Sequence, residues 1–422
     1  MNSFALSNRV ALLICAALLS SSALLMAQAG SLDPTFGKNG IVITPNTDAA
    51  AAMAIQSDGK IVLAGSVIDS QGFPELGLAR YTSNGDLDSS FGTGGIVSNP
   101  DAPAFALALQ SNGKILIGTI ASLGFAVLRL NTDGSLDTTF GTDGTASFRP
   151  FGDLFFSPLT GGIAVLSDGK ILVAAAGGFG GGVMARLLPN GQVDTSFGAD
   201  GAGAVQLLNA PGSVALLPGG KILVSTTVGV SLAARYTSTG ALDTSFGVSG
   251  QVADLGGNAI IPLTNGEFVA VGSLVTETAP PPAPNNTQGF SVVGYNAKGV
   301  IEPKFGTNGA AVTTFPSNTY SLAFAVAVQS NGDIFAGGET APSNPALGGT
   351  GPIDFALARY TSSGQLDTTF GTDGLVTTDV GNSTFITALA IQSDGKILAL
   401  GSNANPAGES NPGFTLARYL AQ

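Results

Sequence analysis

One short phrase recurs seven times in this chain of 422 residues, and every copy ends in Phe-Gly. The copies read SLDPTFG, DLDSSFG, SLDTTFG, QVDTSFG, ALDTSFG, VIEPKFG and QLDTTFG. Their phenylalanines lie 49 to 65 residues apart, at Phe36, Phe91, Phe140, Phe197, Phe246, Phe305 and Phe370. A fixed phrase at a period of about 50 residues indicates a repeat architecture, in which each unit buries its apolar face against its neighbours.

The second unit shows how one repeat is expected to fold. Residues 104–110 (AFALALQ) alternate as a half-buried strand does, and residues 111–113 (SNG) form a turn whose Asn-Gly pair is expected to supply positive φ angles. Residues 114–118, 125–130 and 144–148 then predict three further short strands. Each repeat is therefore expected to be a four-stranded antiparallel sheet.

Radial stacking of such sheets predicts an all-β, seven-bladed β-propeller. A β-helix would need shorter coils, and tandem sandwiches would need about twice the period. The chain opens with a lone fourth strand at Gly40–Thr44 and ends on a third strand at Phe414–Tyr419. The N-terminal strand is expected to pair into the last blade and close the ring, which removes two free sheet edges.

The repeated motifs DGKIL-x-x-G, LARY and NG-x-LD-x-x-FG-x-x-G resemble the delta-60 repeat family over nearly all of residues 31–422. The resemblance implies an extracellular or cell-envelope location, and it implies no established activity. The fifth unit departs most from the pattern. Gly294 stands in the place of the repeated Arg, Glu302 in that of Asp, and Glu267 in that of Lys.

The N-terminus reads as a secretory signal, with Arg9 before an apolar stretch and an Ala-Gln-Ala cleavage site at residues 27–29. We expect a signal peptide at 1–29, a single propeller domain at 30–422 and a secreted or cell-envelope location. An uncleaved membrane anchor is the alternative, because residues 10–27 nearly reach spanning length. Cys15, the only cysteine, lies in this segment.

Composition excludes several function classes. The chain has a net charge of −12, so nucleic acid and anionic membrane surfaces are not expected partners. It has no histidine, and the mature part would have no cysteine, which removes the usual general bases, thiol nucleophiles and zinc sites.

Most basic residues fall at repeat positions and are interpreted as structural. Each strand Arg is expected to pair with a connector Asp at a blade interface, and each phrase Phe to pack between blades. The alternative is an arginine-lined anion site. The six arginines are Arg80, Arg129, Arg186, Arg235, Arg359 and Arg418, and five turn lysines accompany them at Lys60, Lys114, Lys170, Lys221 and Lys396.

No catalytic residue and no cofactor are predicted, because the repeated carboxylates are expected one per blade, too far apart for a carboxylate pair. Calcium is the metal for which the sequence offers weak candidate ligands. Asp133, Asp137 and Asp143 offer oxygen ligands, although Asx turns explain these residues equally well.

The variable loops are expected to carry function, since the second-to-third and fourth-to-first strand connections should emerge on one face. Residues 274–289, 339–353, 402–412 and 67–75 vary in length there. A further insertion at 149–161 carries Phe151, Phe155 and Phe156, which are either a partner contact or buried in the channel mouth.

We therefore expect a monomeric, non-catalytic propeller that binds an extracellular protein or polysaccharide through this variable-loop face. The alternative is an extracellular hydrolase or lyase with a carboxylate site at the channel mouth.

Overall fold

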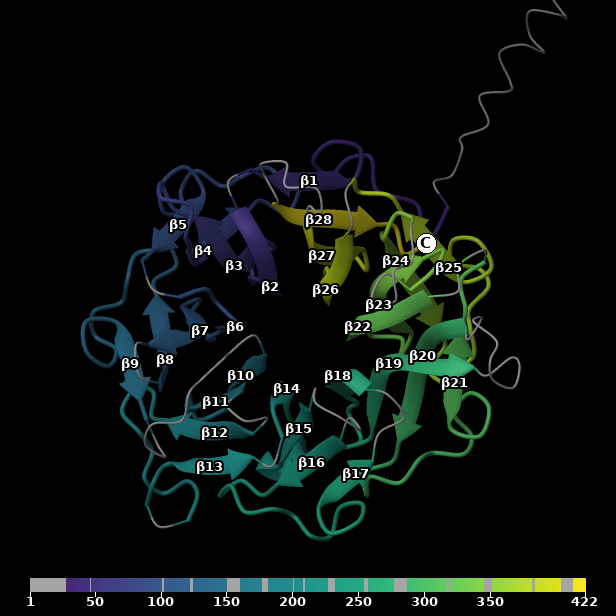
Figure 1. Cartoon of the computed structure of the whole chain (residues 1–422). Coiled ribbons are helices and arrows are strands. Elements are labelled where there is room, and N and C mark those ends of the chain that lie inside the picture. Colours follow the sequence, from purple (N-terminus) through teal and green to yellow (C-terminus); the bar gives the residue numbers. More distant parts are fainter. Residues whose placement is uncertain are drawn as a thin grey trace, which may run out of the picture.

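The computed structural model describes residues 28–45, 47–100, 102–121, 124–149, 160–176, 181–199, 201–207, 209–226, 232–253, 257–276, 287–316, 318, 320–344, 351–381, 384–403 and 413–422. Within these residues, seven four-stranded antiparallel sheets stand around a central axis (Figure 1). The predicted seven-bladed propeller is confirmed.

Blades 1 to 6 each use four consecutive strands, and the first strand of each lies nearest the axis (Figure 1). Blade 1 holds β2 (Thr47–Ile55), β3 (Ile61–Ile68), β4 (Pro74–Tyr81) and β5 (Ile96–Asn99). Blade 2 holds β6 (Ala106–Leu109), β7 (Ile115–Ala121), β8 (Gly124–Leu130) and β9 (Thr145–Phe148). Blade 3 holds β10 (Gly161–Val165), β11 (Ile171–Ala176), β12 (Gly182–Leu187) and β13 (Ala204–Leu207).

Blade 4 holds β14 (Pro211–Leu216), β15 (Ile222–Thr226), β16 (Leu232–Tyr236) and β17 (Gln251–Ala253). Blade 5 holds β18 (Gly257–Pro262), β19 (Phe268–Thr276), β20 (Thr287–Tyr295) and β21 (Ala310–Thr313). Blade 6 holds β22 (Tyr320–Val328), β23 (Ile334–Ala341), β24 (Asp354–Tyr360) and β25 (Leu375–Thr378).

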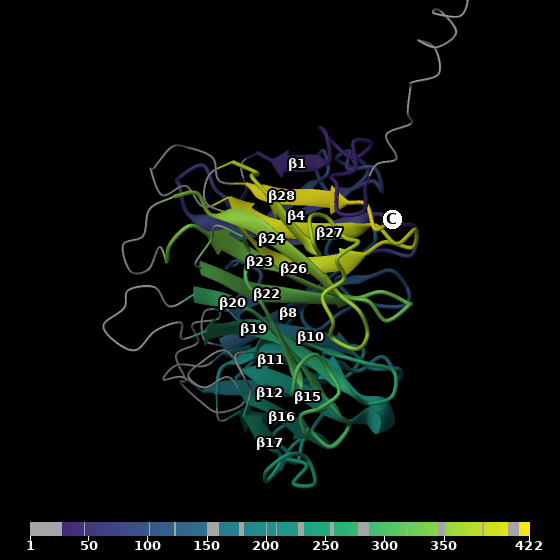
Figure 2. The same ribbon diagram turned by 90° about the vertical axis from the view of Figure 1, so that its right-hand side faces the viewer.

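Blade 7 joins the two ends of the chain. It holds β26 (Thr384–Ile391), β27 (Ile397–Asn403) and β28 (Phe414–Tyr419), and its outer strand is β1 (Ile41–Thr44). β1 pairs with β28 in antiparallel register from Ile41 opposite Ala417 to Thr44 opposite Phe414 (Figures 1 and 2). The predicted closure by the N-terminal strand is confirmed, and it covers the hydrogen-bonding edge of β28.

The core lies between blades because the second and third strands are buried on both faces. One apolar cluster, for example, joins Phe125 and Phe140 of blade 2 to Ile171 and Val183 of blade 3. Comparable clusters fill the other blade interfaces, including the one between blades 7 and 1, where Phe36 and Phe414 meet Leu63. Apolar burial of this kind provides the main stabilisation of the ring.

Six of the seven turns between first and second strands use one positive φ residue, and only the turn at 217–221 uses two, Gly219 and Gly220. Gly59 and Gly113 have φ of 84° and 82°, whereas Asn112 is not among the residues with positive φ. Instead, Asn112 caps the turn, because its Oδ1 accepts a hydrogen bond from the backbone N–H of Lys114.

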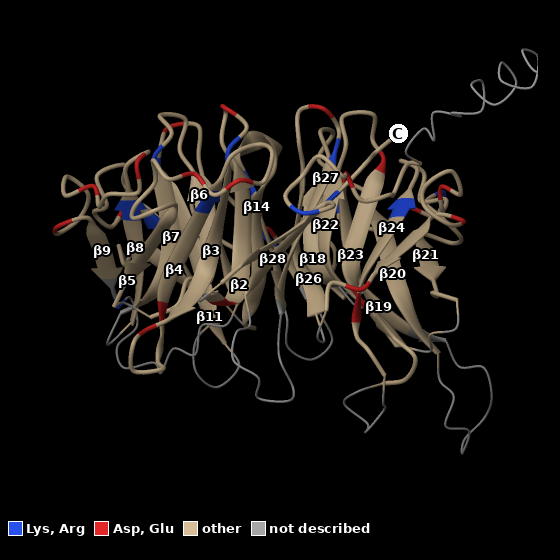
Figure 3. Ribbon diagram, turned by 90° about the horizontal axis from the view of Figure 1, so that it is seen from above, with Lys and Arg blue, Asp and Glu red and all other residues tan. Residues whose placement is uncertain are grey.

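The ring has two unlike faces. The turn face carries these first-to-second strand turns at residues 56–60, 110–114, 166–170, 217–221, 263–267, 329–333 and 392–396, together with the third-to-fourth strand connectors. Charged residues lie mainly at this face, the upper side of Figure 3. The opposite face, where β3, β19 and β23 end, is called the loop face.

Candidate functional site

Each repeated arginine forms a joint between two blades. Arg186 of β12 donates from Nε to Asp194 Oδ2 at 2.7 Å and from NH2 to Ser196 Oγ at 3.2 Å, both in its own connector. Its NH1 donates to the backbone oxygen of Ser238 in the next blade at 2.5 Å. The guanidinium carbon lies 4.6 Å from the centroid of the Phe197 ring, within cation–π range.

The same arrangement recurs around the ring. The NH1 groups of five further arginines bond to a carbonyl of the following blade, Arg80 to Thr132, Arg129 to Pro189, Arg235 to Ala297, Arg359 to Ala421 and Arg418 to Ser83. The structure thus places the repeated Arg beside the repeated Asp and above the phrase Phe. Each of the six guanidiniums pairs with a carboxylate and donates to a carbonyl within the protein, which leaves little for an anion.

The repeated carboxylates are also held by the turn lysines. Asp137 Oδ2 lies 2.5 Å from Lys114 Nζ and 2.6 Å from Arg129 Nε. Burial alone would raise the pKa of Asp137, but hydrogen bonds from Lys114, Thr139 and Arg129 outweigh it and hold that pKa well below its usual range. An ionised carboxylate between two cations is a structural group and a poor general acid or base.

The glycine that ends each repeated phrase also links the two blades of the joint. The N–H of Gly141 donates to the oxygen of Asn190 at 2.8 Å, and six further phrase glycines donate in the same way to the following connector. A Cβ on Gly191 would lie 3.0 Å from the Phe140 ring and 2.7 Å from Gly141 N, so the NG turn of one blade packs directly on the Phe-Gly of the previous blade.

The joint between blades 5 and 6 lacks the arginine. Gly294 takes the arginine position, and a Cβ there would lie 2.5 Å from Cγ of Phe305, so the ring fills that space. Glu302 caps the connector through a hydrogen bond from the N–H of Lys304 to its Oε1. The backbone bond from Gly306 to Ser363 remains, at 2.8 Å.

The three calcium candidates do not converge on one ion. Asp137 is paired with Arg129 and Lys114, Asp133 Oδ1 accepts from the N–H and hydroxyl of Ser135, and Asp143 has φ of 49° in its turn. Among the residues that the structure describes, no group of three or more acidic side chains could hold a metal ion.

The predicted partner contacts Phe151, Phe155 and Phe156 lie outside the described residues. The loop face nevertheless presents one described aromatic side chain. Phe73, at the tip of the β3–β4 hairpin, is 65% exposed, and Ile68 beside it is 39% exposed. The tip is ordered, because Asp69 Oδ1 accepts from the N–H groups of Gln71 and Phe73 and the Asp69 N–H donates to the Phe73 oxygen.

Carboxylates outside the repeat pattern occur in blade 6, toward the loop face. Burial raises the pKa of Asp354 at the start of β24, and nearby Asp379 raises it further. Burial also raises the pKa of Glu339 in β23, against a hydrogen bond from Tyr320 that lowers it. Asp354 and Asp379 flank the outer strands β24 and β25, away from the channel mouth.

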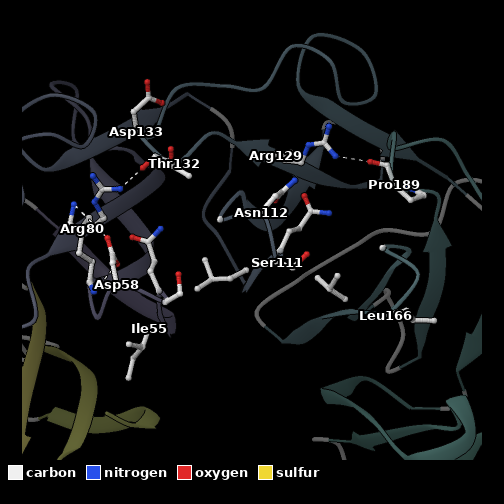
Figure 4. Close-up of a pocket in the computed structure, with 18 of the residues that line it drawn as sticks. Ile55, Asp58, Arg80, Ser111, Asn112, Arg129, Thr132, Asp133, Leu166 and Pro189 are labelled. Atoms are coloured by element: carbon white, nitrogen blue, oxygen red, sulfur yellow. Dashed lines mark hydrogen bonds and ion pairs between the residues drawn. The ribbon is translucent and has the colours of Figure 1, made fainter. Parts of the chain in front are cut away.

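A cavity of about 1360 Å³ opens on the turn face over blades 1 to 3 (Figure 4). The turns at 55–58, 109–113 and 165–169 line it, with parts of the connectors at 132–133 and 189. This cavity was not predicted from the sequence, because the repeats vary in length at the opposite face. The sequence does contain a polar turn at each of these places, but the recurrence of these turns in every repeat favours a structural role for them.

Across the part of the chain that the structure describes, no helix has the length and apolar character needed to cross a membrane.

Comparison with known proteins finds a propeller family model that is similar to four segments of the chain. Residues 56–91, 110–140, 166–197 and 329–370 match the family model described as "Domain of unknown function (DUF5122) beta-propeller". These segments contain the turn, third strand and phrase of blades 1, 2, 3 and 6. No curated protein matches the chain.

Solved structures are similar to the chain at low identity. A fungal alcohol oxidase of the AA5 family, solved in complex with copper, is 13% identical with a TM-score of 0.50, covering 93% of this chain and 76% of its own. Virginiamycin B lyase from Staphylococcus aureus is 12% identical with a TM-score of 0.46, covering 89% and 99%. Such likeness concerns the fold and does not extend to activity.

Proposed function

We propose that the protein is an exported, non-catalytic propeller that binds an extracellular protein or polysaccharide through its loop face. The observation that carries this proposal is the exposed tip formed by Ile68 and Phe73. An aromatic side chain that is 65% exposed on a hydrogen-bonded turn is pre-organised for contact, and little conformational entropy is lost when it binds.

The repeated carboxylates favour binding over hydrolysis. Lys170 and Arg186 both pair with Asp194, and equivalent cations pair with the Asp of blades 1, 2, 4 and 7. A hydrolase or lyase at the channel mouth would need carboxylates outside these pairs. Export is proposed from the N-terminal segment with its small-residue cleavage site.

The test is a screen of the purified mature chain on glycan and peptide arrays, with calcium and with chelator. We expect binding that falls at least about fivefold in a Phe73→Ser variant, because an interface aromatic is often an energetic centre. Val248→Ser is the matched control, since Val248 is 82% exposed but lies in a connector on the turn face. Binding that both variants retain, or no binding to any array member, would argue against the proposal.

A further inference from the structure

The cavity over blades 1 to 3 is lined by residues that include hydrogen-bonding groups without a partner. Figure 4 shows Asp58, Asp133, Ser111 and Asn112 around it, with Ile55 and Leu166 at its apolar wall. Its volume of about 1360 Å³ exceeds that of an ordinary small-molecule pocket, and its lining comes from three blades. An extended ligand therefore fits it better than a compact one.

The cationic groups of the lining are already neutralised. Arg80 donates to Asp88, Ser90 and the Thr132 oxygen, and Arg129 makes the equivalent three contacts. Lys60 lies 3.0 Å from Asp88 but 3.8 Å from Asp58. The cavity thus presents little net positive charge to a ligand.

Three carboxylates at its rim keep an oxygen for a ligand, one from each blade. The side chains of Asp58 and Asp168 are 56% and 55% exposed, and each lies 3.8 Å from its lysine, which is drawn toward a buried Asp. Hydrogen bonds from the Ser135 side chain and backbone lower the pKa of Asp133, so it is ionised. Both of those bonds go to Oδ1 of Asp133.

Two glutamines of the wall hold an unpaired amide oxygen just beneath its surface. Gln56 Oε1 and Gln110 Oε1 are buried and have no hydrogen-bond partner. At the same repeat position in blades 6 and 7, Gln329 donates to the Gly395 oxygen and Gln392 accepts from Arg418. Blades 1 and 2 thus differ from blades 6 and 7 in this unpaired acceptor. Each of the two oxygens gains a hydrogen bond when its side chain turns toward a donor in the cavity.

We propose that this cavity binds an extended, positively charged peptide segment of a partner protein, with Lys or Arg side chains at Asp58, Asp133 and Asp168. Peptide N–H groups and cationic side chains are donors, which matches a lining rich in acceptors. The site lies on the face opposite Phe73, so the inference is independent of the loop-face binding proposed above.

The test uses the mature chain and three acetylated, amidated heptapeptides in which Gly alternates with Lys, with Gln or with Glu. We expect calorimetry to show binding of the Lys peptide alone, weakening from low to physiological salt because exposed charges are screened over about 8 Å. A triple variant, Asp58→Asn, Asp133→Asn and Asp168→Asn, should bind about tenfold more weakly, since three exposed charge pairs are lost together.

The chain supplies its own controls for folding. Asn112 of blade 2 stands at the repeat position of Asp58, and Asn190 of blade 3 stands at that of Asp133. Each of these asparagines caps its turn, so both turns accept Asn. Asp394→Asn is the matched charge control, because Asp394 has the same turn position in blade 7 and lies outside the cavity. It should leave the affinity unchanged.

Other outcomes would overturn the proposal. Equal binding of the Gln peptide would indicate a neutral polar ligand, and an equal loss in Asp394→Asn would indicate unspecific attraction to an acidic protein. Spermidine binding as tightly as the Lys peptide would assign the cavity to free polyamines. No binding of the Lys peptide at low salt would remove the site altogether.

Discussion

At the scale of the residue, the repeated arginine has the largest role in joining the blades. Arg186 is 6% exposed, and it joins a carboxylate, a hydroxyl, an aromatic ring and a carbonyl of the following blade. Only a planar fork of donors can make these contacts together, which explains why lysine does not replace it. The carboxylate partner is ionised, so removal of the cation leaves a buried charge.

Replacing Arg186 by methionine should lower the free energy of unfolding by about 3 kcal/mol, because loss of one partner of a buried ion pair is strongly destabilising. Lys38→Met, at an exposed site, should change it by less than about 0.5 kcal/mol. Denaturant unfolding followed by circular dichroism measures both values. Equal effects of the two substitutions would show that Arg186 has no role in joining blades 3 and 4.

The pairing of Arg with Asp could be predicted from the sequence, because six copies at one spacing indicate a structural role. The bond from Arg129 to the Pro189 oxygen could not be predicted, since that contact joins residues 60 positions apart and depends on how adjacent blades are inclined. The cavity at Gln56 and Gln110 was missed for a related reason. Repetition shows which side chains are alike but not which of them lack a partner once the ring has formed.

At the scale of the element, every joint between blades contains the repeated arginine except one. The joint of blades 2 and 3 has Arg129 stacked on Phe140, whereas the joint of blades 5 and 6 has Gly294 and a ring that fills the gap. Phe305 is 6% exposed where Phe140 is fully buried. Both joints keep the same backbone bond of 2.8 Å, from Gly141 and from Gly306.

Amide hydrogen exchange should therefore be faster at Gly306 than at Gly141, by about tenfold or more. One charge-assisted hydrogen bond contributes about 1.5–3 kcal/mol, and local opening of the joint sets the exchange rate. Exchange followed by mass spectrometry with residue-level fragmentation gives the comparison. Gly198, in the joint with Arg186, is the control and should exchange like Gly141. Equal protection at Gly306 would show that the arginine does not determine the strength of the joint.

At the scale of the whole molecule, the ring carries a shared dependence on pH. Burial alone would raise the pKa of Asp33, but hydrogen bonds from Thr35 and Lys396 and the charge of Arg418 lower it from 3.8 to about 2. The pKa values of Asp88, Asp137, Asp194 and Asp243 are also lowered. In each of these four, a hydrogen bond from the Ser or Thr two residues further on, together with two cations, holds the carboxylate in its ionised form.

The stabilisation that these aspartates provide should therefore be complete above about pH 4 and be lost as the pH drops toward 2. A folded-state pKa below the unfolded value of 3.8 gives stabilisation that is complete above 3.8 and is lost as the pH falls through the folded-state value. Urea midpoints measured across this range test the prediction. Arg186→Met should show a shallower decline, because it reduces the shift at Asp194. A midpoint that rises on acidification would contradict the assignment.

The ends of the chain meet inside one interrupted connector. The first half of this connector is residues 419–422 (YLAQ), and its second half is residues 30–33 (GSLD). Together they have the same length as the uninterrupted connector segment 236–243 (YTSTGALD) of blade 4. Gly30 has φ of 86°, as Gly240 has 91°, and its N–H donates to the Leu420 oxygen. The repeat thus continues across the termini without a covalent bond.

A circular permutant that joins Gln422 directly to Gly30 and begins at Thr47 should fold with a melting temperature within a few degrees of the parent, since the joined connector has the ordinary length. A chain that simply begins at Thr47 should lose stability and self-associate. It leaves the edge of β28 unpaired and Arg418 without Asp33, which lies 2.9 Å away in the intact ring. Calorimetry and light scattering distinguish the two proteins. If the truncated chain is as stable and as monomeric as the permutant, then β1 contributes nothing to closure, and the ring is held by its blade interfaces alone.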